Sequence, residues 1–437
     1  MAKTKDVYIL TNFSSYLRSF SPIIVVAEQL KMLTRAGYNP ILIACEGWEP
    51  PKDSIYAQVE TKYMYPTAQH DPKAKVEETE DIVNISYGQL NDILPDEAVV
   101  LTHDLIFLPD YTIYNLAARR LATDRPSLRW LHWVHSATNP EAISKERGMY
   151  GEKYADTLMS PFPNSLICYP NAYDIRRVGT NFHFEEDRVV EVPHSTDPTE
   201  GLHPLVQRFY DEKKIGDADV LMIYPLRLDR GKYVEANIRL LSAMRRNRMK
   251  AHLLVCDFQS TGDDKLVYRA DLKKLAEELD VGDWVTFLSE FDDMAHMDVP
   301  HEVILDFFTL SNIFIMPSKS ETYSLVTQEA MLKGNLVIMN HDFAPFRQIF
   351  GDQAIYRQFD GANISISGDN GEIETKHGTP DEYDDYYLNM AKNIKYYLRY
   401  DRVLSAKTWV RTKRNPDYVF SEYIEPLILR QNENSQV

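Results

Sequence analysis

The residues most able to do chemistry lie in segment 316–331, Met-Pro-Ser-Lys-Ser-Glu-Thr-Tyr-Ser-Leu-Val-Thr-Gln-Glu-Ala-Met. A strand should end at the start of this segment, and a helix should begin near Thr322 or Ser324. The first N–H groups of a helix have no partner within it, and the helix dipole favours an anion there. The segment therefore predicts a phosphate site, formed by the backbone N–H groups of Tyr323, Ser324 and Leu325.

Two carboxylates accompany this phosphate site. Glu329 can accept hydrogen bonds from a ribose diol, and Glu321 can accept them from sugar hydroxyls. Carboxylates beside a diphosphate need nearby cations, which Arg227 and Lys232 can supply. The segment 226–232 also follows an expected strand and opens an expected helix, so it should lie on the same rim. The pattern predicts a site for a nucleoside diphosphate joined to a sugar.

The first half of the chain alternates between strands and helices, which predicts a parallel sheet with right-handed crossovers. A helix should begin at Ser21 and Pro22, because serine caps helices and proline suits the first turn. Gly37 should follow its end. The apolar runs expected to form strands are 7–10, 41–44, 98–101, 128–134, 165–169 and 188–192, with a further helix at 111–121.

A second alternating set follows residues 193–211, whose turn-forming residues predict a linker. Strands are expected at 220–224, 252–256, 284–288, 313–316 and 336–339, and helices at 233–245, 266–279, 302–310 and 324–332. The polar stretch 360–381 should form a loop, with helices at 382–400 and 418–429.

Two such sets predict an α/β protein with two doubly wound, Rossmann-like domains that bind ligands at the carboxyl ends of their strands. We expect a first domain at 1–197 and a second at 198–400. A C-terminal helical segment, 401–437, should pack back toward the first domain.

Composition narrows the classes of function. The 437 residues carry a formal net charge of −17, which counts against non-specific binding to nucleic acid or anionic lipid. No apolar run is long enough for a membrane helix, and the N-terminus lacks a signal-peptide pattern, so we expect a cytoplasmic protein. Cys45, Cys168 and Cys256 are far apart and suit buried positions rather than a disulfide framework or a metal site.

The segment with the two glutamates resembles glycosyltransferase family four, whose members have the GT-B fold. That family carries two glutamates in the setting PS-x-S-E-x-[FY]-x-L-V-x-x-E-A-M, which Glu321 and Glu329 match. It also carries an Arg and a Lys in G-R-L-x-x-x-K-G. Arg227 and Lys232 match these, whereas Leu226 and Tyr233 replace the two glycines.

The resemblance is strongest over Tyr224–Asn340 and weaker in the first half. Residues 188–197 are similar to the family's interdomain stretch, with His194 and Ser195 in place of Asn and Gly. His103 and Asp104 are similar to the end of a family strand, and Val134-His135 to the end of the next. Many members have a Gly-Gly loop after the first strand, where this chain has residues 11–15, Thr-Asn-Phe-Ser-Ser.

The resemblance implies a hexosyltransferase-like enzyme that transfers a sugar with retention of anomeric configuration, without a metal or a cofactor. Arg227, Lys232 and the helix start would stabilise charge on the leaving diphosphate. Glu321 would hold the donor sugar, Glu329 the ribose, and His135 the reacting region. His103 and Asp104 are candidates for contact with the acceptor or the sugar. The base could be that of UDP or GDP, and the acceptor is not named by the sequence.

Three other functions stay open. The chain could be a sugar-nucleotide epimerase or hydrolase, or an inactive glycosyltransferase-like scaffold that binds a partner. It could also glycosylate modified DNA through a local groove, despite its acidic charge. The Asp217-Ala218-Asp219 triplet resembles a metal-binding signature but precedes a strand, so we expect a loop or cap. The basic cluster 245–250 is explained by its place at a helix C-terminus.

Overall fold

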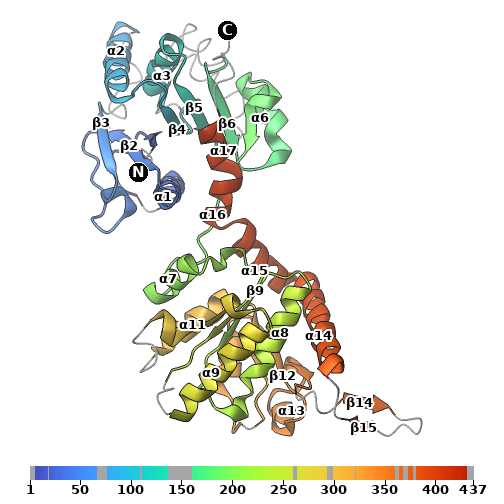
Figure 1. The fold of residues 1–437 in the computed structure, drawn as a ribbon. Helices are drawn as coiled ribbons and strands as arrows, with labels where there is room; N and C mark the ends of the chain where they lie inside the picture. The colour runs from blue at the N-terminus through green and yellow to red at the C-terminus, as the bar shows by residue number, and fades with distance from the viewer. Residues whose placement is uncertain are drawn as a thin grey trace. The chain divides into compact units, whose positions relative to one another are not determined.

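The computed structural model describes residues 5–17, 19–65, 76–108, 111–135, 160–258, 263–292, 299–319, 321–359, 364–367, 373–376 and 380–430. The chain divides into two units, each built around its own parallel sheet (Figure 1). The first unit is Met1–Ser195 with Pro416–Val437, and the second is Thr196–Asn415. The expected α/β fold with two Rossmann-like domains is confirmed.

The first unit contains a seven-stranded parallel sheet in the order β3-β2-β1-β4-β5-β6-β7. The strand order reverses between β1 and β4, which is the topological switch point where such sheets bind ligands. The strands are β1 (Asp6–Leu10), β2 (Asn39–Cys45), β3 (Glu60–Met64), β4 (Val99–His103), β5 (Arg129–Trp133), β6 (Ser165–Tyr169) and β7 (Val189–Glu191).

Alternate strand residues of this sheet enter two separate cores. Val7 and Ile9 pack on one face with α1, whereas Tyr8 and Leu10 pack on the other face with α2 and α3. Such two-sided burial explains why the strands are apolar runs rather than alternating patterns. The helices are α1 (Ser21–Arg35), α2 (Val76–Ile93), α3 (Thr112–Asp124) and α6 (Ile175–Phe182).

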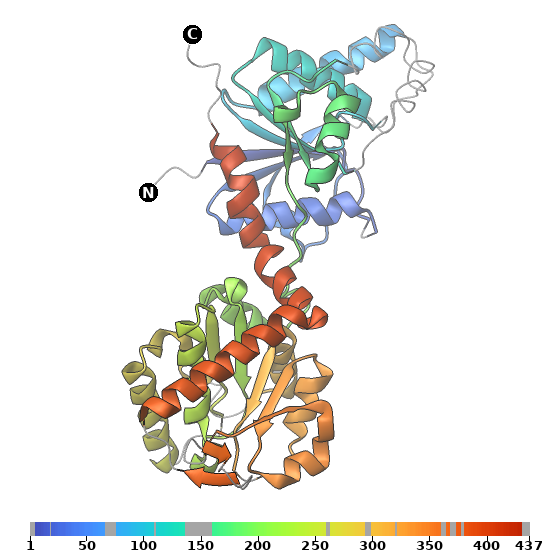
Figure 2. The same ribbon diagram turned by 90° about the vertical axis from the view of Figure 1, so that its right-hand side faces the viewer.

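The end of the chain belongs to the first unit. It forms α16 (Pro416–Val419), a π-helical turn at Phe420–Ile424 and α17 (Glu425–Leu429), visible in red in Figure 2. Phe420, Ile424 and Ile428 are buried in the core on the α1 face. Arg129 donates to the carbonyls of Leu427 and Ile428, and Lys5 Nζ donates to the Ile428 carbonyl at 3.2 Å. These cations satisfy carbonyls that the helix end leaves without partners.

The second unit contains a six-stranded parallel sheet in the order β10-β9-β8-β11-β12-β13, and its strand order reverses between β8 and β11. The strands are β8 (Val220–Tyr224), β9 (Ala251–Val255), β10 (Val285–Phe287), β11 (Ile313–Met316), β12 (Leu336–Asn340) and β13 (Ile355–Arg357). The helices are α7 (Pro204–Glu212), α8 (Val234–Arg246), α9 (Asp263–Glu278), α10 (Leu288–Phe291), α11 (His301–Leu310), α12 (Leu325–Leu332), α13 (Ala344–Phe350), α14 (Pro380–Tyr400) and α15 (Arg402–Lys413).

Two stretches differ from the sequence expectation. The stretch 193–211, expected to be a linker, contains α7, which begins at Pro204 with a side-chain cap from His203. The polar stretch 360–381, expected to be a loop, contains the antiparallel hairpin β14 (Ile364–Ser367) and β15 (Ile373–Lys376). Alternating isoleucines around Gly-Asp-Asn-Gly are a hairpin signal that the overall polarity masked. No helix in the described part of the chain is long and apolar enough to span a bilayer.

Arg129 offers a test of how the C-terminal helix is held. Arg129→Met keeps much of the apolar stem but removes the donors to the Leu427 and Ile428 carbonyls. We expect the free energy of unfolding to fall by about 1–3 kcal/mol, measured by urea titration, because partly buried carbonyls lose their partners. Arg177→Met is the matched control, since Arg177 pairs with Asp174 at an exposed position and should contribute about 0.5 kcal/mol or less. Equal effects of the two changes would contradict this account.

Candidate functional site

Two loops meet at the switch point of the second sheet. One follows β8 at 225–233 and the other follows β11 at 317–324. The Lys319 N–H donates to the Gly231 carbonyl at 3.0 Å, which joins the two loops directly. Asn340, at the end of β12, donates its side-chain amide to the Ser318 carbonyl at 3.2 Å. The sheet thus brings together the segments that carry the two glutamates and the two cations, as the sequence pattern predicts.

Lys232 and Glu321 form an ion pair at this junction, with side chains only 18% and 13% exposed. Beneath them, the buried Tyr224 hydroxyl donates to the Lys232 carbonyl at 3.2 Å. Burial raises the pKa of Tyr224, and nearby acidic groups including the Glu321 carboxylate add to the effect. The tyrosine therefore stays protonated and supports the loop as a donor. An ammonium has three donors, so Lys232 can bind an anion while it stays paired with Glu321.

The start of α12 presents backbone N–H groups that have no hydrogen-bond partner among the described residues. Ser324 lies in the left-handed region, with φ 73° and ψ 73°, and Leu325 is the first helical residue. No acceptor among the described residues is bonded to the N–H groups of Tyr323, Ser324 or Leu325. Ser320, in the same loop, lies outside the described residues. Unpaired N–H groups at a helix start form an anion site that suits a phosphate.

Glu329 has a partner that the sequence analysis missed. His301 Nε2 lies 2.9 Å from Glu329 Oε1, and the glutamate side chain is 26% exposed. His301 is the first residue of α11, and no motif spacing connects it to Glu329. The contact occupies one carboxylate oxygen, so the second oxygen is the one most available to accept a hydroxyl.

Arg227 has a different environment from Lys232. It is exposed, and no carboxylate among the described residues pairs with it. Nearby Arg230 is already engaged, because it pairs with Asp271 at 2.6 Å and lies over the Tyr268 ring. Arg227 is therefore the cation of this loop most available to a phosphate.

Tyr233 has the backbone geometry that a glycine usually supplies. Its φ is 54° and its ψ 53°, directly before α8, where the resembled motif has a glycine. A left-handed conformation costs a non-glycine residue about 1–2 kcal/mol. Lys319 Nζ lies 4.7 Å from the centre of the Tyr233 ring, which links the two loops a second time. The substitution thus keeps the local backbone of the motif and adds a contact.

The first unit gathers its candidate residues at its own switch point. His103 ends β4, Asp104 follows it with φ 55°, and His135 follows β5. His103 Nδ1 lies 2.9 Å from His135 Nε2, and the His135 N–H donates to Asp104 Oδ1 at 2.9 Å. The ring of His194 lies nearly parallel to that of His135, with ring centres 5.3 Å apart. His103, Asp104 and His135 are therefore neighbours.

Burial shapes the charges of this group. It lowers the pKa of His103 well below its usual range, and the neighbouring His135 and His194 add to the effect. Burial also lowers the pKa of His135 to about 4, and that of His194, which is lowered further by His135. It raises the pKa of Asp104 to about 6. The imidazoles are consequently neutral near pH 7 and can exchange hydrogen bonds without charge repulsion.

The loop after β1 is held by its own side chains, at the place where many members of the resembled family have Gly-Gly. The Thr11 hydroxyl donates to the Ile43 carbonyl at 3.0 Å, and the Asn12 N–H donates to the Tyr111 hydroxyl at 3.3 Å. The Phe13 ring is buried against Trp48, with ring centres 5.3 Å apart. The Asn12 N–H therefore already has a partner, unlike the N–H groups before α12.

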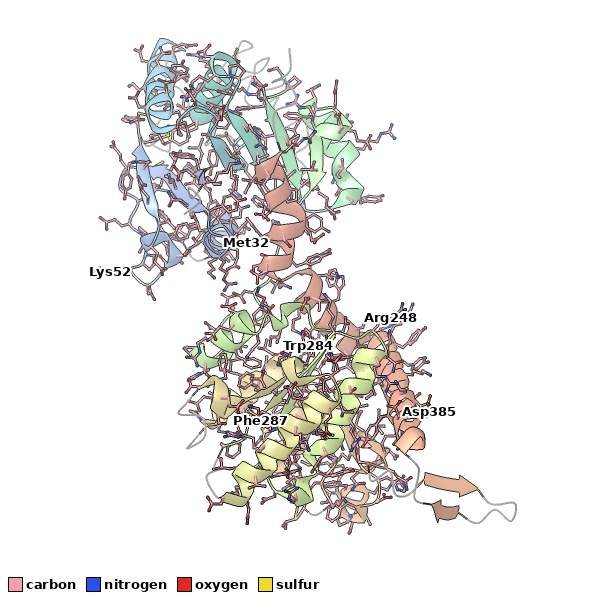
Figure 3. The ribbon with its side chains drawn as sticks, viewed as in Figure 1. Met32, Lys52, Arg248, Trp284, Phe287 and Asp385 are labelled. Carbon is pink, nitrogen blue, oxygen red and sulfur yellow. The ribbon has the colours of Figure 1, made fainter. Side chains whose placement is uncertain are left out.

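Other charged features have structural explanations. Asp217 pairs with Lys250 at 2.6 Å, and Asp219 accepts from the Lys250 N–H at 2.8 Å, so the acidic triplet joins the segments that precede β8 and β9. In the basic cluster, the Arg245 guanidinium lies 3.4 Å from the ring centre of Trp284, a residue labelled in Figure 3, and Arg246 pairs with Asp384. No group of three or more potential ligands among the described residues is arranged to hold a metal.

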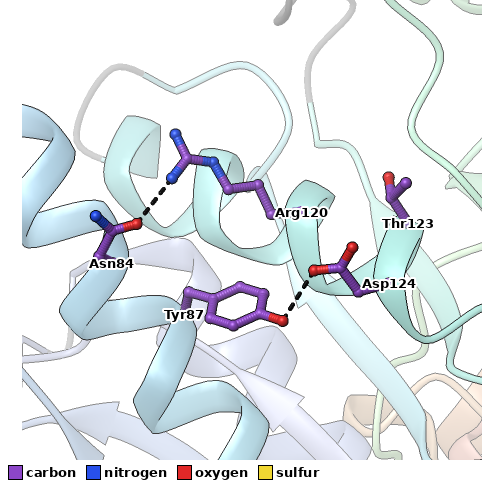
Figure 4. A pocket seen from close by; sticks show the side chains of 5 residues that line it. All are labelled: Asn84, Tyr87, Arg120, Thr123 and Asp124. Atoms are coloured by element: carbon purple, nitrogen blue, oxygen red, sulfur yellow. Dashed lines mark hydrogen bonds between the residues drawn. The ribbon is translucent and has the colours of Figure 1, made fainter.

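A hollow of about 440 Å³ lies between α2 and α3. In it, Arg120 donates to Asn84 at 3.0 Å and Tyr87 to Asp124 at 2.9 Å (Figure 4). Four of its five lining side chains are thus bonded in pairs, and none of the residues singled out from the sequence lines it.

Comparison with known proteins bears on the second unit. Residues 207–362 match the family model described as glycosyl transferases group 1. The second unit carries a glycosyltransferase domain. The match spans both loops of the switch point, including the Lys232–Glu321 ion pair and the start of α12. No curated protein is similar enough in sequence to match the chain.

Three solved glycosyltransferase-related structures are similar over nearly the whole chain. A glycosyltransferase from Rickettsia africae has 11% identity and a TM-score of 0.36, and covers 98% of this chain and 100% of its own. HepE of Anabaena, in complex with UDP and glucose, has 10% identity and a TM-score of 0.34, with coverage of 97% and 99%. The lipopolysaccharide outer core galactosyltransferase WaaB has 13% identity and a TM-score of 0.35, with coverage of 97% and 99%.

Because Tyr233 has a left-handed backbone, we expect glycine to be more stable than alanine at this position, and the reverse order at an ordinary helix position. Tyr233→Gly should be about 1 kcal/mol more stable than Tyr233→Ala, because both lose the ring and only alanine keeps the left-handed strain. At exposed Arg239, inside α8, alanine should instead be about 1 kcal/mol more stable than glycine. Urea unfolding of the four variants measures both differences. The same order at both positions would show that Tyr233 is not strained.

The shifted pKa values of His103, His135 and His194 predict how the stability of the protein depends on pH. Histidines whose pKa is lowered by folding contribute stability that is present above their usual value of about 6.5 and lost as pH falls toward 4. Asp104, with a pKa raised to about 6, acts in the opposite sense, since its contribution is lost as pH rises through 6. The three histidines together outweigh the single carboxyl of Asp104. The free energy of unfolding should therefore fall as the pH is lowered from 6.5 to 4.

His135→Asn should make this fall smaller by removing one of the groups that resists protonation. Urea titrations at several pH values measure the slope. His183→Asn is the control, because His183 is exposed and its left-handed backbone is one that asparagine tolerates. An unchanged slope in His135→Asn would show that His135 is not kept neutral by folding.

Proposed function

We propose that the chain is a retaining glycosyltransferase of the GT-B type that uses a nucleoside diphosphate sugar as donor. The observation that carries the proposal is the junction of the two loops in the second unit. There the partly buried Lys232–Glu321 pair stands on the same rim as the unpaired N–H groups that start α12. The glycosyltransferase group 1 match over 207–362 covers the same residues.

The geometry gives each group a part in donor binding. The N–H groups of Tyr323, Ser324 and Leu325 donate hydrogen bonds to the diphosphate, and Lys232 and Arg227 balance its charge. Glu321, held by Lys232, accepts hydrogen bonds from the donor sugar. The free oxygen of Glu329 accepts one from the ribose, while His301 holds the other oxygen.

The same groups support the reaction. Negative charge grows on the diphosphate as the bond to the sugar breaks, and cations already in place stabilise it without reorganisation. We propose that Arg227 and Lys232 supply the positive charge that stabilises the leaving diphosphate, so that the transfer needs neither metal nor cofactor. The leaving phosphate oxygen takes the proton of the acceptor hydroxyl, and the new bond forms on the face that the diphosphate leaves. That course retains the anomeric configuration.

Thermal unfolding with UDP, GDP and their sugars tests the donor site. A ligand present at about 100 times its dissociation constant adds about 2.7 kcal/mol of stability. We expect one diphosphate to stabilise the wild type strongly and Glu329→Ala weakly. Glu302→Ala is the matched control, because Glu302 is an exposed glutamate in the first turn of α11 and should behave as wild type.

The stabilisation by a nucleoside diphosphate can be compared with that by its free nucleoside. The difference measures the contribution of the phosphate contacts, apart from the contacts of the base and ribose. Lys232→Met should bring the stabilisation by the diphosphate close to that by its nucleoside. The absence of stabilisation of the wild type by any nucleotide at millimolar concentration would contradict the proposal. Turnover of the donor that is equally fast without any acceptor would instead identify a hydrolase or an epimerase.

A further inference from the structure

A buried chain of hydrogen bonds runs from α1 to the partly exposed His135. Gln29, on α1, is 3% exposed, and its Oε1 lies 2.9 Å from His103 Nε2. His103 is 1% exposed, and its other nitrogen lies 2.9 Å from His135 Nε2. Both nitrogens of His103 are therefore occupied within the protein, so His103 can affect a ligand only through His135.

The direction of this chain follows from the chemistry of its ends. A carbonyl oxygen can only accept, so His103 Nε2 must donate to Gln29 Oε1. In a neutral imidazole the second nitrogen is then an acceptor, so His103 Nδ1 must accept from His135 Nε2–H. The neutral His135 that results carries no proton on Nδ1. No described residue is hydrogen bonded to that nitrogen.

The rest of His135 is fixed in place. Its N–H donates to Asp104 Oδ1 at 2.9 Å, and its ring lies nearly parallel to those of His103 and His194, with ring centres 5.2 and 5.3 Å away. We infer that Gln29 and His103 are positioning residues that hold His135 in the tautomer whose Nδ1 lone pair accepts a hydrogen bond from a substrate hydroxyl. The inference rests on the proposed transferase function and extends it to the first unit.

The chain of hydrogen bonds from Gln29 through His103 to His135, here called the relay, explains why a polar side chain is buried on α1. The neighbours of Gln29 on the inner face of this helix include Val26, Leu30 and Leu33, all apolar. A buried amide there costs free energy unless it is bonded. A buried neighbour can hold a catalytic histidine in its productive tautomer. Loss of such a neighbour can reduce kcat by much more than the free energy of one hydrogen bond would suggest.

Two changes at Gln29 separate a positioning role from a structural one. Gln29→Leu removes the acceptor, so both tautomers of His135 become populated and kcat should fall about tenfold or more. Gln29→Glu keeps an acceptor but favours a protonated His103, which donates from both nitrogens and so reverses the contact to His135. This variant should be active at high pH and should gain an acid limb in its pH profile that the wild type lacks. The titratable groups facing His103 are His135, His194 and Asp104.

Thr102→Val is the matched control. Thr102 is also buried in the first unit, and its hydroxyl bonds to His132 Nδ1 at 2.8 Å, outside the relay. This variant should lose stability but keep kcat and the pH profile of the wild type. A loss of kcat in Thr102→Val as large as that in Gln29→Leu would show a merely structural role for Gln29.

The tautomer itself can be read by nitrogen NMR of the histidines in the full chain, with the His135 signals assigned from His135→Asn. We expect an unprotonated Nδ1 in the wild type and a mixture in Gln29→Leu. A protonated Nδ1 in the wild type would overturn the inference, even if transfer activity is present. Stabilisation by UDP or GDP should be unchanged in the Gln29 variants. If UDP and GDP failed to stabilise the wild type, that result would contradict the proposed function but not the inference about His135. The NMR signals would still show which tautomer His135 adopts.

Discussion

The ion pair between Lys232 and Glu321 is the interaction on which the second unit's candidate site depends. A carboxylate that is 13% exposed needs a cation, and the cation comes from a loop about ninety positions earlier in the chain. The pair can form only because β8 and β11 are adjacent at the reversal of strand order. The Lys319–Gly231 backbone bond and the contact of Lys319 with the Tyr233 ring hold the same two loops. With the loops fixed, the unpaired N–H groups of α12 and the two cations occupy one rim.

The first unit applies the same topological principle with different chemistry. Its switch point holds three neighbouring imidazoles and a carboxyl rather than an ion pair, and burial keeps the imidazoles neutral. Neutral imidazoles each have one donor and one acceptor nitrogen, so a chain of them has a direction. Gln29 sets that direction from α1. The second unit thus offers charges suited to a diphosphate, whereas the first offers an oriented lone pair suited to a hydroxyl.

The sequence predicted every strand of the two sheets except β3 and β13, because runs buried on both faces are apolar throughout. Most residues of β3 and β13 are not fully buried, so these strands lack that apolar signal, and the helix α2 was not predicted either. The sequence also placed Glu321, Lys232 and the start of α12 together, since the carboxyl ends of adjacent parallel strands share an edge. The contact between His301 and Glu329 was missed because it joins two helix positions that no motif connects. Gln29 was missed because one polar residue on an apolar helix face carries no sign of what it bonds to. The left-handed backbone at Tyr233 was hidden by a residue type that rarely adopts it.

Hydrogen exchange at the start of α12 tests the central claim most directly. Peptides covering residues 321–332 would be followed by mass spectrometry with UDP and with GDP, each compared with its nucleoside. The account predicts that at least one diphosphate slows exchange at the N–H groups of Tyr323, Ser324 and Leu325, whereas its nucleoside does not. A diphosphate that binds and protects other parts of the chain, but leaves these three N–H groups unchanged, would contradict it.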